Sequence, residues 1–252
     1  MIVIKCNKLT KTYKKGATAL KDITLKINSG SITGFVGENG SGKSTTINIL
    51  TSLITKSSGY IEIFGKELNE KNCNDIKRKI GFVGEQIVAF QHLNVIDYWN
   101  FIGRIFKLKK SDIYNRINEL LDILDLQKDK NKIMRKFSKG MKQKALLGGA
   151  LIHGPQLLIL DEPLDGIDLP SRIIIKNILK QMNSSGVTIF ISSHDFSLIE
   201  DICTDLVVIN EGTIKFNNTV DELYNQYKDL SLEQIFIKLI NKEDKLNKKL
   251  SW

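Results

Sequence analysis

The sequence has no uninterrupted apolar run of the about 18 residues that a membrane-spanning helix requires. The most apolar stretch, ALLGGALIHGPQLLIL, is broken near its middle by histidine, glycine, proline and glutamine at 153–156. The N-terminal segment MIVIKCNKLTKTYKK places its charges after the apolar residues, which is the reverse of a secretory signal peptide. We therefore expect a cytoplasmic protein that reaches a membrane only through a partner.

Cysteine and arginine are also scarce. Cys6, Cys73 and Cys203 are scattered without paired spacing, so the sequence favours reduced thiols over a disulfide framework or a zinc site. The formal net charge of +9 comes mostly from evenly spread lysines, with only five arginines. Because arginine is the residue suited to bidentate phosphate and base contacts, we expect a solvated basic surface and no nucleic-acid partner. Such a surface is also compatible with work beside an anionic membrane.

The remaining composition indicates an α/β protein. A chain of 252 residues suits one large domain or two small ones. The segment ALKDITLKI alternates, and places Ile23, Leu25 and Ile27 on one face of a strand. The segments QLLILDEP (156–163) and GVTIFISSH (186–194) contain continuous apolar runs, which are typical of parallel strands covered on both faces.

Strand signals become rare between about residues 91 and 152, where we predict a helical subdomain. Its segment SDIYNRINELLDILDL begins with Ser111 or Asp112 as candidate N-cap. A charged, helical extension is predicted over 219–252, after a nucleotide-binding domain over 1–218. The apolar stripe of SDIYNRINELLDILDL consists of Ile113, Ile117, Leu120, Leu121 and Leu124.

The segment GENGSGKS at 37–44 fits the phosphate-loop pattern G-x-x-x-x-G-K-[ST]. Glycines let the backbone curl so that successive N–H groups face phosphate oxygens, and the following helix adds its dipole. Lys43 is predicted to reach the β- and γ-phosphates, Ser44 to bind Mg²⁺, and Thr45 to contact the α-phosphate. The predicted nucleotide-binding residues of this loop are Gly37, Glu38, Asn39, Gly40, Ser41, Gly42, Lys43, Ser44 and Thr45.

Two further polar groups follow the predicted buried strands. In LLILDEP, Asp161 is expected to bind Mg²⁺ and Glu162 to act on a water in line with the γ-phosphate. The alternative is that these carboxylates cap the next helix. In ISSHD, His194 follows a strand expected to lie beside the Asp161 strand, which predicts a contact with the γ-phosphate. A structural histidine is the alternative for that position.

Phosphate-loop enzymes are many, and these parts alone also serve kinases, GTPases and motors. The segment FSKGMKQKALLGGAL, at 137–151, resembles the signature segment of ATP-binding cassette (ABC) ATPases. Tyr13 falls where that family places an aromatic residue that stacks on adenine, and GFVGEQ occupies the family's glutamine loop. LDGID, at 164–168, occupies the loop that links the two ATP sites. The resemblance covers nearly the whole chain.

The resemblance implies a fold, a reaction and partners. The fold is a P-loop NTPase (RecA-like) α/β core with a mostly parallel sheet, an N-terminal antiparallel β subdomain and an inserted helical subdomain. The reaction is Mg²⁺-dependent ATP hydrolysis, with Lys43, Glu162 and His194 as catalytic residues. Two cassettes associate head to tail, and Ser138 and the Gly140 N–H contact the γ-phosphate bound by the partner cassette. The metal-binding residues are Ser44, Glu85 and Asp161.

Several positions depart from the family pattern. Lys139 replaces the first glycine of the signature and Met141 its glutamine, while Gly84 stands where proline is common. Either Glu85 or its neighbour Gln86 is the glutamine-loop residue, and the register favours Glu85. Asp165 replaces a more usual serine or asparagine.

The signature variant and the late segment SLEQIFIKLI resemble the branch of bacterial exporter ATPases encoded apart from their permease, including drug, lantibiotic and bacitracin-type self-protection pumps. The resemblance therefore implies an integral membrane permease and a second cassette as partners, at the inner face of the cell membrane. The alternative is a non-transport ABC ATPase of iron–sulfur assembly or translation, which acts on soluble partners.

Overall fold

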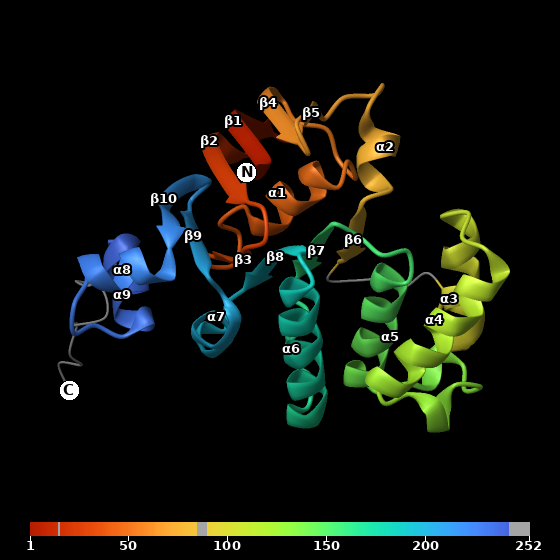
Figure 1. Cartoon of the computed structure of the whole chain (residues 1–252). Coiled ribbons are helices and arrows are strands. Elements are labelled where there is room, and N and C mark those ends of the chain that lie inside the picture. Colours follow the sequence, from red (N-terminus) through yellow and green to blue (C-terminus); the bar gives the residue numbers. More distant parts are fainter. Residues whose placement is uncertain (15, 85–89, 242–252) are drawn as a thin grey trace. The chain divides into compact units, whose positions relative to one another are not determined.

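The computed structural model describes residues 1–14, 16–84 and 90–241 (Figure 1). Glu85 and Gln86, the candidate glutamine-loop residues, lie outside these ranges. The chain forms two compact units, one of Met1–Glu67 with Ser192–Trp252 and the other of Leu68–Ile191.

The first unit contains a four-stranded antiparallel sheet in the order β2-β1-β4-β5. Ile23, Leu25 and Ile27 of β2 are buried in alternation with exposed neighbours, so the predicted strand and its apolar face are confirmed. The predicted N-terminal antiparallel sheet is confirmed as well. The four strands are β1 (Ile2–Thr12), β2 (Thr18–Asn28), β4 (Ser58–Ile63) and β5 (Lys66–Glu67).

Three strands of a second sheet also belong to this unit. β3 (Ile32–Val36) pairs in parallel with β9 (Asp205–Asn210), and β9 pairs antiparallel with β10 (Thr213–Thr219). All five residues of β3 are buried, as expected for a strand covered on both faces. α1 (Lys43–Leu50) follows β3 after the predicted phosphate loop, and α7 (Phe196–Ile202) precedes β9.

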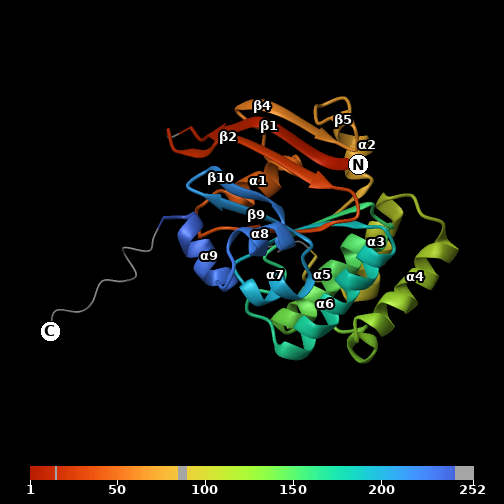
Figure 2. The same ribbon diagram turned by 60° about the vertical axis from the view of Figure 1, so that its left-hand side comes forward.

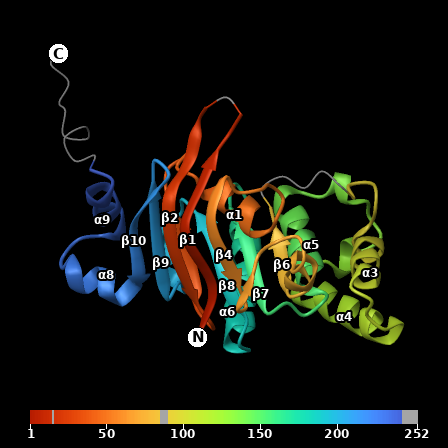
Figure 3. The ribbon, with the colours of Figure 1, turned by 90° about the horizontal axis from the view of Figure 1, so that it is seen from above.

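The C-terminal helices share a hydrophobic core with these strands (Figure 3). α8 (Val220–Gln226) contributes Leu223, and α9 (Leu232–Leu239) is held by a Ser231 capping box. Burial of their apolar faces stabilises the strands as well as the helices. The buried cluster consists of Val36, Ile199, Leu206, Val208, Leu223, Leu232, Ile235 and Ile240.

The second unit has parallel strands at its centre. β6 (Ile80–Val83) pairs in parallel with β7 (Leu157–Asp161), and β7 neighbours β8 (Thr188–Ser193), whose last two residues belong to the first unit. The expected adjacency of the Asp161 strand and the strand before His194 is therefore confirmed. α2 (Cys73–Lys77) precedes β6, and α6 (Leu169–Ser184) follows β7.

The remaining helices of this unit form the predicted helical region (Figure 2). Trp99 is fully buried, and its indole N–H donates to the Ala145 carbonyl at 2.7 Å, which fastens the first long helix of the region to the last. These elements are α3 (Val95–Ile105), α4 (Lys110–Ile123), the 3₁₀ turns Gln127–Asp129 and Met134–Lys136, and α5 (Lys139–Leu151). Among the described residues, no helix is both long and apolar enough to cross a membrane.

The predicted stripe of α4 is confirmed, since all five of its apolar residues are buried. The predicted N-cap is wrong: α4 begins at Lys110 after Lys109, whose backbone is extended. Leu108 N–H donates to the Gly103 carbonyl at 3.0 Å in the preceding turn, and this turn sets the start of the helix. Ser111 instead donates to the Asp112 carboxylate within the first turn.

Candidate functional site

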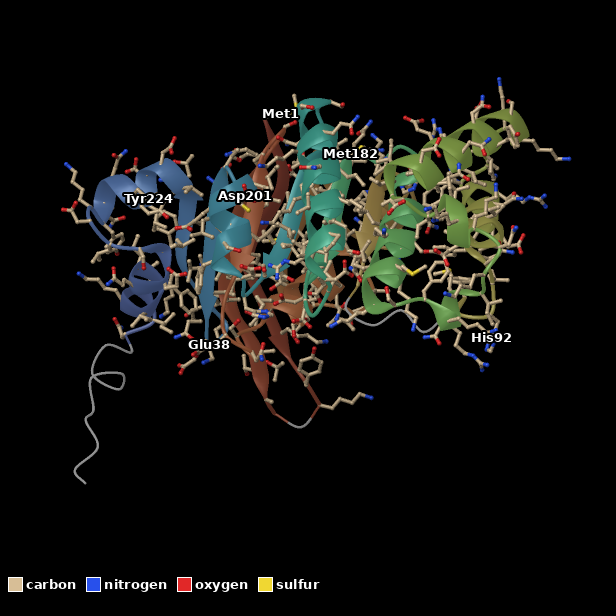
Figure 4. All side chains as sticks on the ribbon, turned by 90° about the horizontal axis from the view of Figure 1, so that it is seen from below. Met1, Glu38, His92, Met182, Asp201 and Tyr224 are labelled. Carbon is tan, nitrogen blue, oxygen red and sulfur yellow. The ribbon has the colours of Figure 1, made fainter. Side chains whose placement is uncertain are left out.

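A glycine-rich loop joins β3 to α1 in the first unit. The Lys43 ammonium, at the start of α1, folds back over this loop and donates to the carbonyl oxygens of Gly37 at 2.7 Å and Glu38 at 3.3 Å. Lys43 is only 6% exposed. Its ammonium therefore lies inside the curl of the loop, in contact with backbone carbonyl oxygens. Figure 4 labels Glu38 of this loop.

The loop is held from outside by the turn between β9 and β10. Gly212 N–H donates to the Ser41 carbonyl at 2.9 Å, and the Gly212 carbonyl accepts from Lys21 N–H at 2.8 Å. Gly42 has a φ of 115° and lies so close to β2 that a Cβ there would come 2.7 Å from Leu20 Cδ2. Only glycine fits this conformation and this space, which explains the second glycine of the motif.

The interior of the loop is suited to an anion. Ser41 Oγ is buried and makes no hydrogen bond within the described part of the chain. Gly42, the N-cap of α1, gives the helix no side-chain cap, and the first turn has no acidic residue. Its first amides are therefore available to a ligand, and the dipole favours negative charge there. These residues fit the polyphosphate of a nucleotide.

The remaining residues of the motif lie around this interior. Ser44 and Thr45 are half-buried in the first turn of α1, while Asn39 and Gly40 are exposed at the tip of the loop. The Tyr13 hydroxyl lies 3.3 Å from Thr45 Oγ1, and the Tyr13 ring is 42% exposed. An exposed aromatic side chain therefore lies beside the first turn of α1.

The carboxylates after β7 lie in the second unit. Asp161 is buried at the end of the strand, and Glu162 has a φ of 48°, a left-handed conformation that is rare for residues other than glycine. α6 is capped by Asp168, whose carboxylate accepts from Ser171 N–H at 2.9 Å. The alternative that Asp161 and Glu162 cap this helix is therefore wrong. The same Ser171 hydrogen bonds lower the pKa of Asp168.

The signature turn lies in this unit too. Ser138 is the N-cap of α5, where its hydroxyl oxygen accepts from Met141 N–H at 3.2 Å. Ser138 and Lys139 are exposed, whereas Gly140 is buried. A Cβ at Gly140 would collide with Asp168 Oδ2 and Ser171 Oγ. Glycine is required because the start of α6 lies directly against it.

Sequence reasoning missed one contact of this turn. The Lys139 ammonium lies 3.0 Å from Asp165 Oδ2. Both residues depart from the pattern of the family that the sequence resembles. The sequence did show opposite charges at two positions that depart from the family pattern. It could not show that these positions, which are 26 residues apart, are in contact.

His194 belongs to the first unit, between β8 and α7, and it is exposed. Asp195 fixes the chain beside it, since its carboxylate caps α7 by accepting from Ser197 N–H at 3.0 Å and its N–H donates to Ser193 Oγ at 3.0 Å. α7 is held in turn by α8 and α9. The Tyr224 hydroxyl donates to the Glu200 carboxylate at 2.6 Å, and the rings of Phe196 and Phe236 lie 5.2 Å apart.

The fold and this loop define a phosphate-loop nucleotide-binding protein. The family model described as "ABC transporter" matches residues 20–165. The chain is 38% identical over 216 residues to the bacitracin transport ATP-binding protein BcrA of Bacillus licheniformis, which covers 84% of this chain and 68% of that protein. It is 33% identical to the methionine import ATP-binding protein MetN 1 of Acinetobacter baylyi over 92% of this chain and 69% of that protein.

Solved structures agree with these relatives. An ATP-binding subunit of an ABC transporter matches with a TM-score of 0.87 and 26% identity, over 94% of this chain and 99% of its own. A dimeric ATP-binding cassette in a post-hydrolysis state with ADP and Pi matches with a TM-score of 0.79 and 26% identity, over 86% of this chain and 98% of its own. CbiO1 from Clostridium perfringens, part of the transporter complex cbiONQ, matches with a TM-score of 0.79 and 27% identity, over 94% of this chain and 98% of its own.

The chain belongs to the ABC transporter family. It is an ATP-binding subunit with ATPase activity, and the phosphate-loop NTPase fold expected from its sequence is confirmed.

Proposed function

We propose that this ATPase drives export through a separate membrane permease, at the inner face of the cell membrane. The main observation for its chemistry is the loop at 37–44, with its buried Ser41 hydroxyl, its uncapped helix start and its inward-turned Lys43. The direction rests on the likeness to the bacitracin transport protein. Import is the second candidate, since a methionine import protein is also similar. A non-transport ATPase with soluble partners is the third.

In this proposal Lys43 and the loop amides hold the phosphates of ATP. Ser44, Asp161 and Glu85 supply oxygen ligands for Mg²⁺, which suits a cation that keeps waters and phosphate oxygens in its shell. Mg²⁺ held by these residues would neutralise phosphate charge. Glu162 accepts a proton from the attacking water, and His194 contacts the γ-phosphate. The strained backbone of Glu162 is the kind of feature that clusters at catalytic sites.

Two copies of the chain close on ATP, head to tail. Ser138 and the Gly140 N–H of one copy contact the γ-phosphate held by the partner's phosphate loop. The geometry of the turn supports this role, since the Ser138 oxygen accepts from its own helix while its hydroxyl hydrogen is a further donor. The first amides of α5 also have no intrahelical acceptor.

This composite site is tested by complementation between two damaged chains. Lys43→Ala loses its phosphate contact but keeps a sound signature, and Ser138→Arg does the reverse. Each homodimer is expected to be nearly inactive. In a covalently linked Lys43→Ala/Ser138→Arg pair one composite site is intact, so part of the ATPase activity should return. The control is a linked pair of wild type with the double mutant, in which neither composite site is intact. Half of wild-type activity in that control contradicts a site shared between copies.

The permease is proposed to dock on α3 of the helical region. Phe101 and Ile105 of α3 lie one helical turn apart and are 44% and 56% exposed. Two exposed apolar side chains on one helical face offer a partner a small apolar contact. Phe101→Ser with Ile105→Ser should reduce recovery of the permease from detergent-solubilised membranes and leave the ATPase rate of the free chain intact. Ile123→Ser, on α4, is the matched control.

The direction of transport is tested after the co-purified membrane protein has been identified and expressed with the chain. In inside-out vesicles an exporter accumulates its cargo when ATP is added, whereas an importer depletes it. Recovery of soluble partners alone would favour the non-transport alternative.

A further inference from the structure

Lys139 and Asp165 form an ion pair between the signature turn and the loop that follows β7. The ammonium and carboxylate lie 3.0 Å apart, and the two side chains are 60% and 51% exposed. Gly166 accommodates the pair: its φ is 59°, and a Cβ there would come 2.6 Å from Lys139 Nζ. Exposed pairs of this kind contribute little to folding stability, so a role in folding does not account for it.

Lys139 occupies an unfavourable place for a cation. It is the first residue of α5, directly after its cap Ser138, where the helix dipole favours negative charge. Asp165 supplies that negative charge from outside the helix. A phosphate that reached Ser138 and the Gly140 amide would supply it as well, and the long side chain of Lys139, the residue between them, is a second partner for that charge.

Asp165 is in turn connected to Glu162. The Asp165 N–H donates to the Glu162 carbonyl at 3.2 Å, across a turn in which Glu162 has its φ of 48°. Two consecutive contacts therefore lead from the signature turn to the proposed general base of the same chain.

We propose that Lys139 is a further γ-phosphate-binding residue, held by Asp165 until ATP arrives on a second copy of the chain. The γ-phosphate and Asp165 compete for one ammonium, and the loss of Lys139 leaves the Asp165 turn, and Glu162 within it, free to rearrange. The ligand is a nucleoside triphosphate, because a diphosphate lacks the group that competes. This inference rests on the proposed function of Ser138 across a dimer.

The test compares Lys139→Met, Asp165→Asn and the double variant, each in a Glu162→Gln chain that binds ATP without turning it over. The measured quantity is the ATP concentration that gives half-maximal dimer formation at fixed ionic strength. Lys142→Met is the matched control, since it removes a positive charge from the same turn of α5 without removing the partner of Asp165. ADP binding to each monomer checks that the phosphate loop is intact.

Competition requires opposite effects. Asp165→Asn should lower the half-maximal ATP concentration, and Lys139→Met should raise it, each by about two- to fivefold, the size expected for an exposed charge contact. The double variant should behave like Lys139→Met, because in this proposal Asp165 affects ATP binding by holding the Lys139 ammonium.

The inference is overturned if Lys139→Met and Asp165→Asn shift the half-maximal ATP concentration in the same direction. An ion pair that only maintains the shape of the turn would give that result. An effect of Asp165→Asn that persists without Lys139 overturns it too, as does an equal shift in Lys142→Met. If the Glu162→Gln parent binds ATP but forms no dimer at any ATP concentration, the proposed site across a dimer is wrong, and the competition at that site is wrong with it.

Discussion

The Tyr13 hydroxyl lies 3.3 Å from Thr45 Oγ1, so an aromatic residue directly after β1 contacts the first turn of the phosphate-loop helix. The Lys11 ammonium lies 5.2 Å from the centre of the same ring. These contacts hold an exposed ring in one place, so less side-chain entropy is lost when a base stacks on it.

Tyr13→Ala should weaken ATP binding by about 1–3 kcal/mol, the range of base–aromatic stacking. Tyr13→Phe keeps the ring and removes only the hydroxyl next to Thr45, so a much smaller loss is expected, and Tyr13→Trp should be nearly neutral. Titration with a fluorescent ATP analogue measures the three affinities. Equal losses in the Ala and Trp variants would assign Tyr13 to packing.

Glu162→Gln should reduce steady-state hydrolysis by about 10²–10⁴-fold, since the amide cannot accept the proton of the attacking water. The change keeps the shape of the side chain and removes a negative charge, so ATP binding should persist and an ATP-dependent dimer should accumulate. Phosphate release and size-exclusion chromatography measure the two effects. Near-normal turnover would remove Glu162 from its proposed role.

Gly140→Ala should destabilise the protein although alanine is the better helix former. The propensity gain is about 0.5–1 kcal/mol, whereas overpacking against Asp168 and Ser171 costs about 1–3 kcal/mol. Urea unfolding shows whether the free energy of unfolding falls or rises in the variant. Ser171→Ala in the same chain removes one of the two colliding groups and should recover part of the loss. A net stabilisation by Gly140→Ala would contradict the observed packing.

His153 should make unfolding dependent on pH. Its Nδ1 is buried without a hydrogen bond within the described residues, its Nε2 lies 3.1 Å from the Ile80 carbonyl, and its ring stacks on Phe106. Burial, opposed by the Ile80 carbonyl and assisted by the charge of Arg116, lowers the pKa of His153 from 6.5 to about 4.

Between these two pKa values the unfolded chain binds a proton that the folded chain does not, so stability falls as the pH drops from about 6.5 towards 4. The full difference is at most about 3 kcal/mol. Urea midpoints of the wild type and His153→Gln at pH 7 and pH 5 measure it. The urea midpoint of the variant should change less between pH 7 and pH 5 than that of the wild type. If the midpoints of both proteins change by the same amount, the pKa of His153 is not depressed.

The phosphate loop and the strands around it could be predicted because local sequence decides them. The glycines at 37–42 allow a curl that few other residues permit, and the continuous apolar runs in QLLILDEP and GVTIFISSH are typical of parallel strands covered on both faces. The buried stripe of α4 followed in the same way from its helical spacing. The start of α4 could not be predicted in this way, because the turn after α3 sets it and the Ser111 hydroxyl donates to the Asp112 carboxylate.

Sequence by itself determined the family, the phosphate loop and the residue types available for catalysis, because each depends on a short contiguous pattern. Tertiary structure alone decided which distant segments meet. Gly212 holds Ser41 across more than half of the chain, and Lys139 meets Asp165. The first contact arises when the turn between β9 and β10 meets the phosphate loop within the first unit, and the second when the loop after β7 meets the start of α5 within the second unit. The positions that they bring together carry no common local pattern from which the pairing could be read.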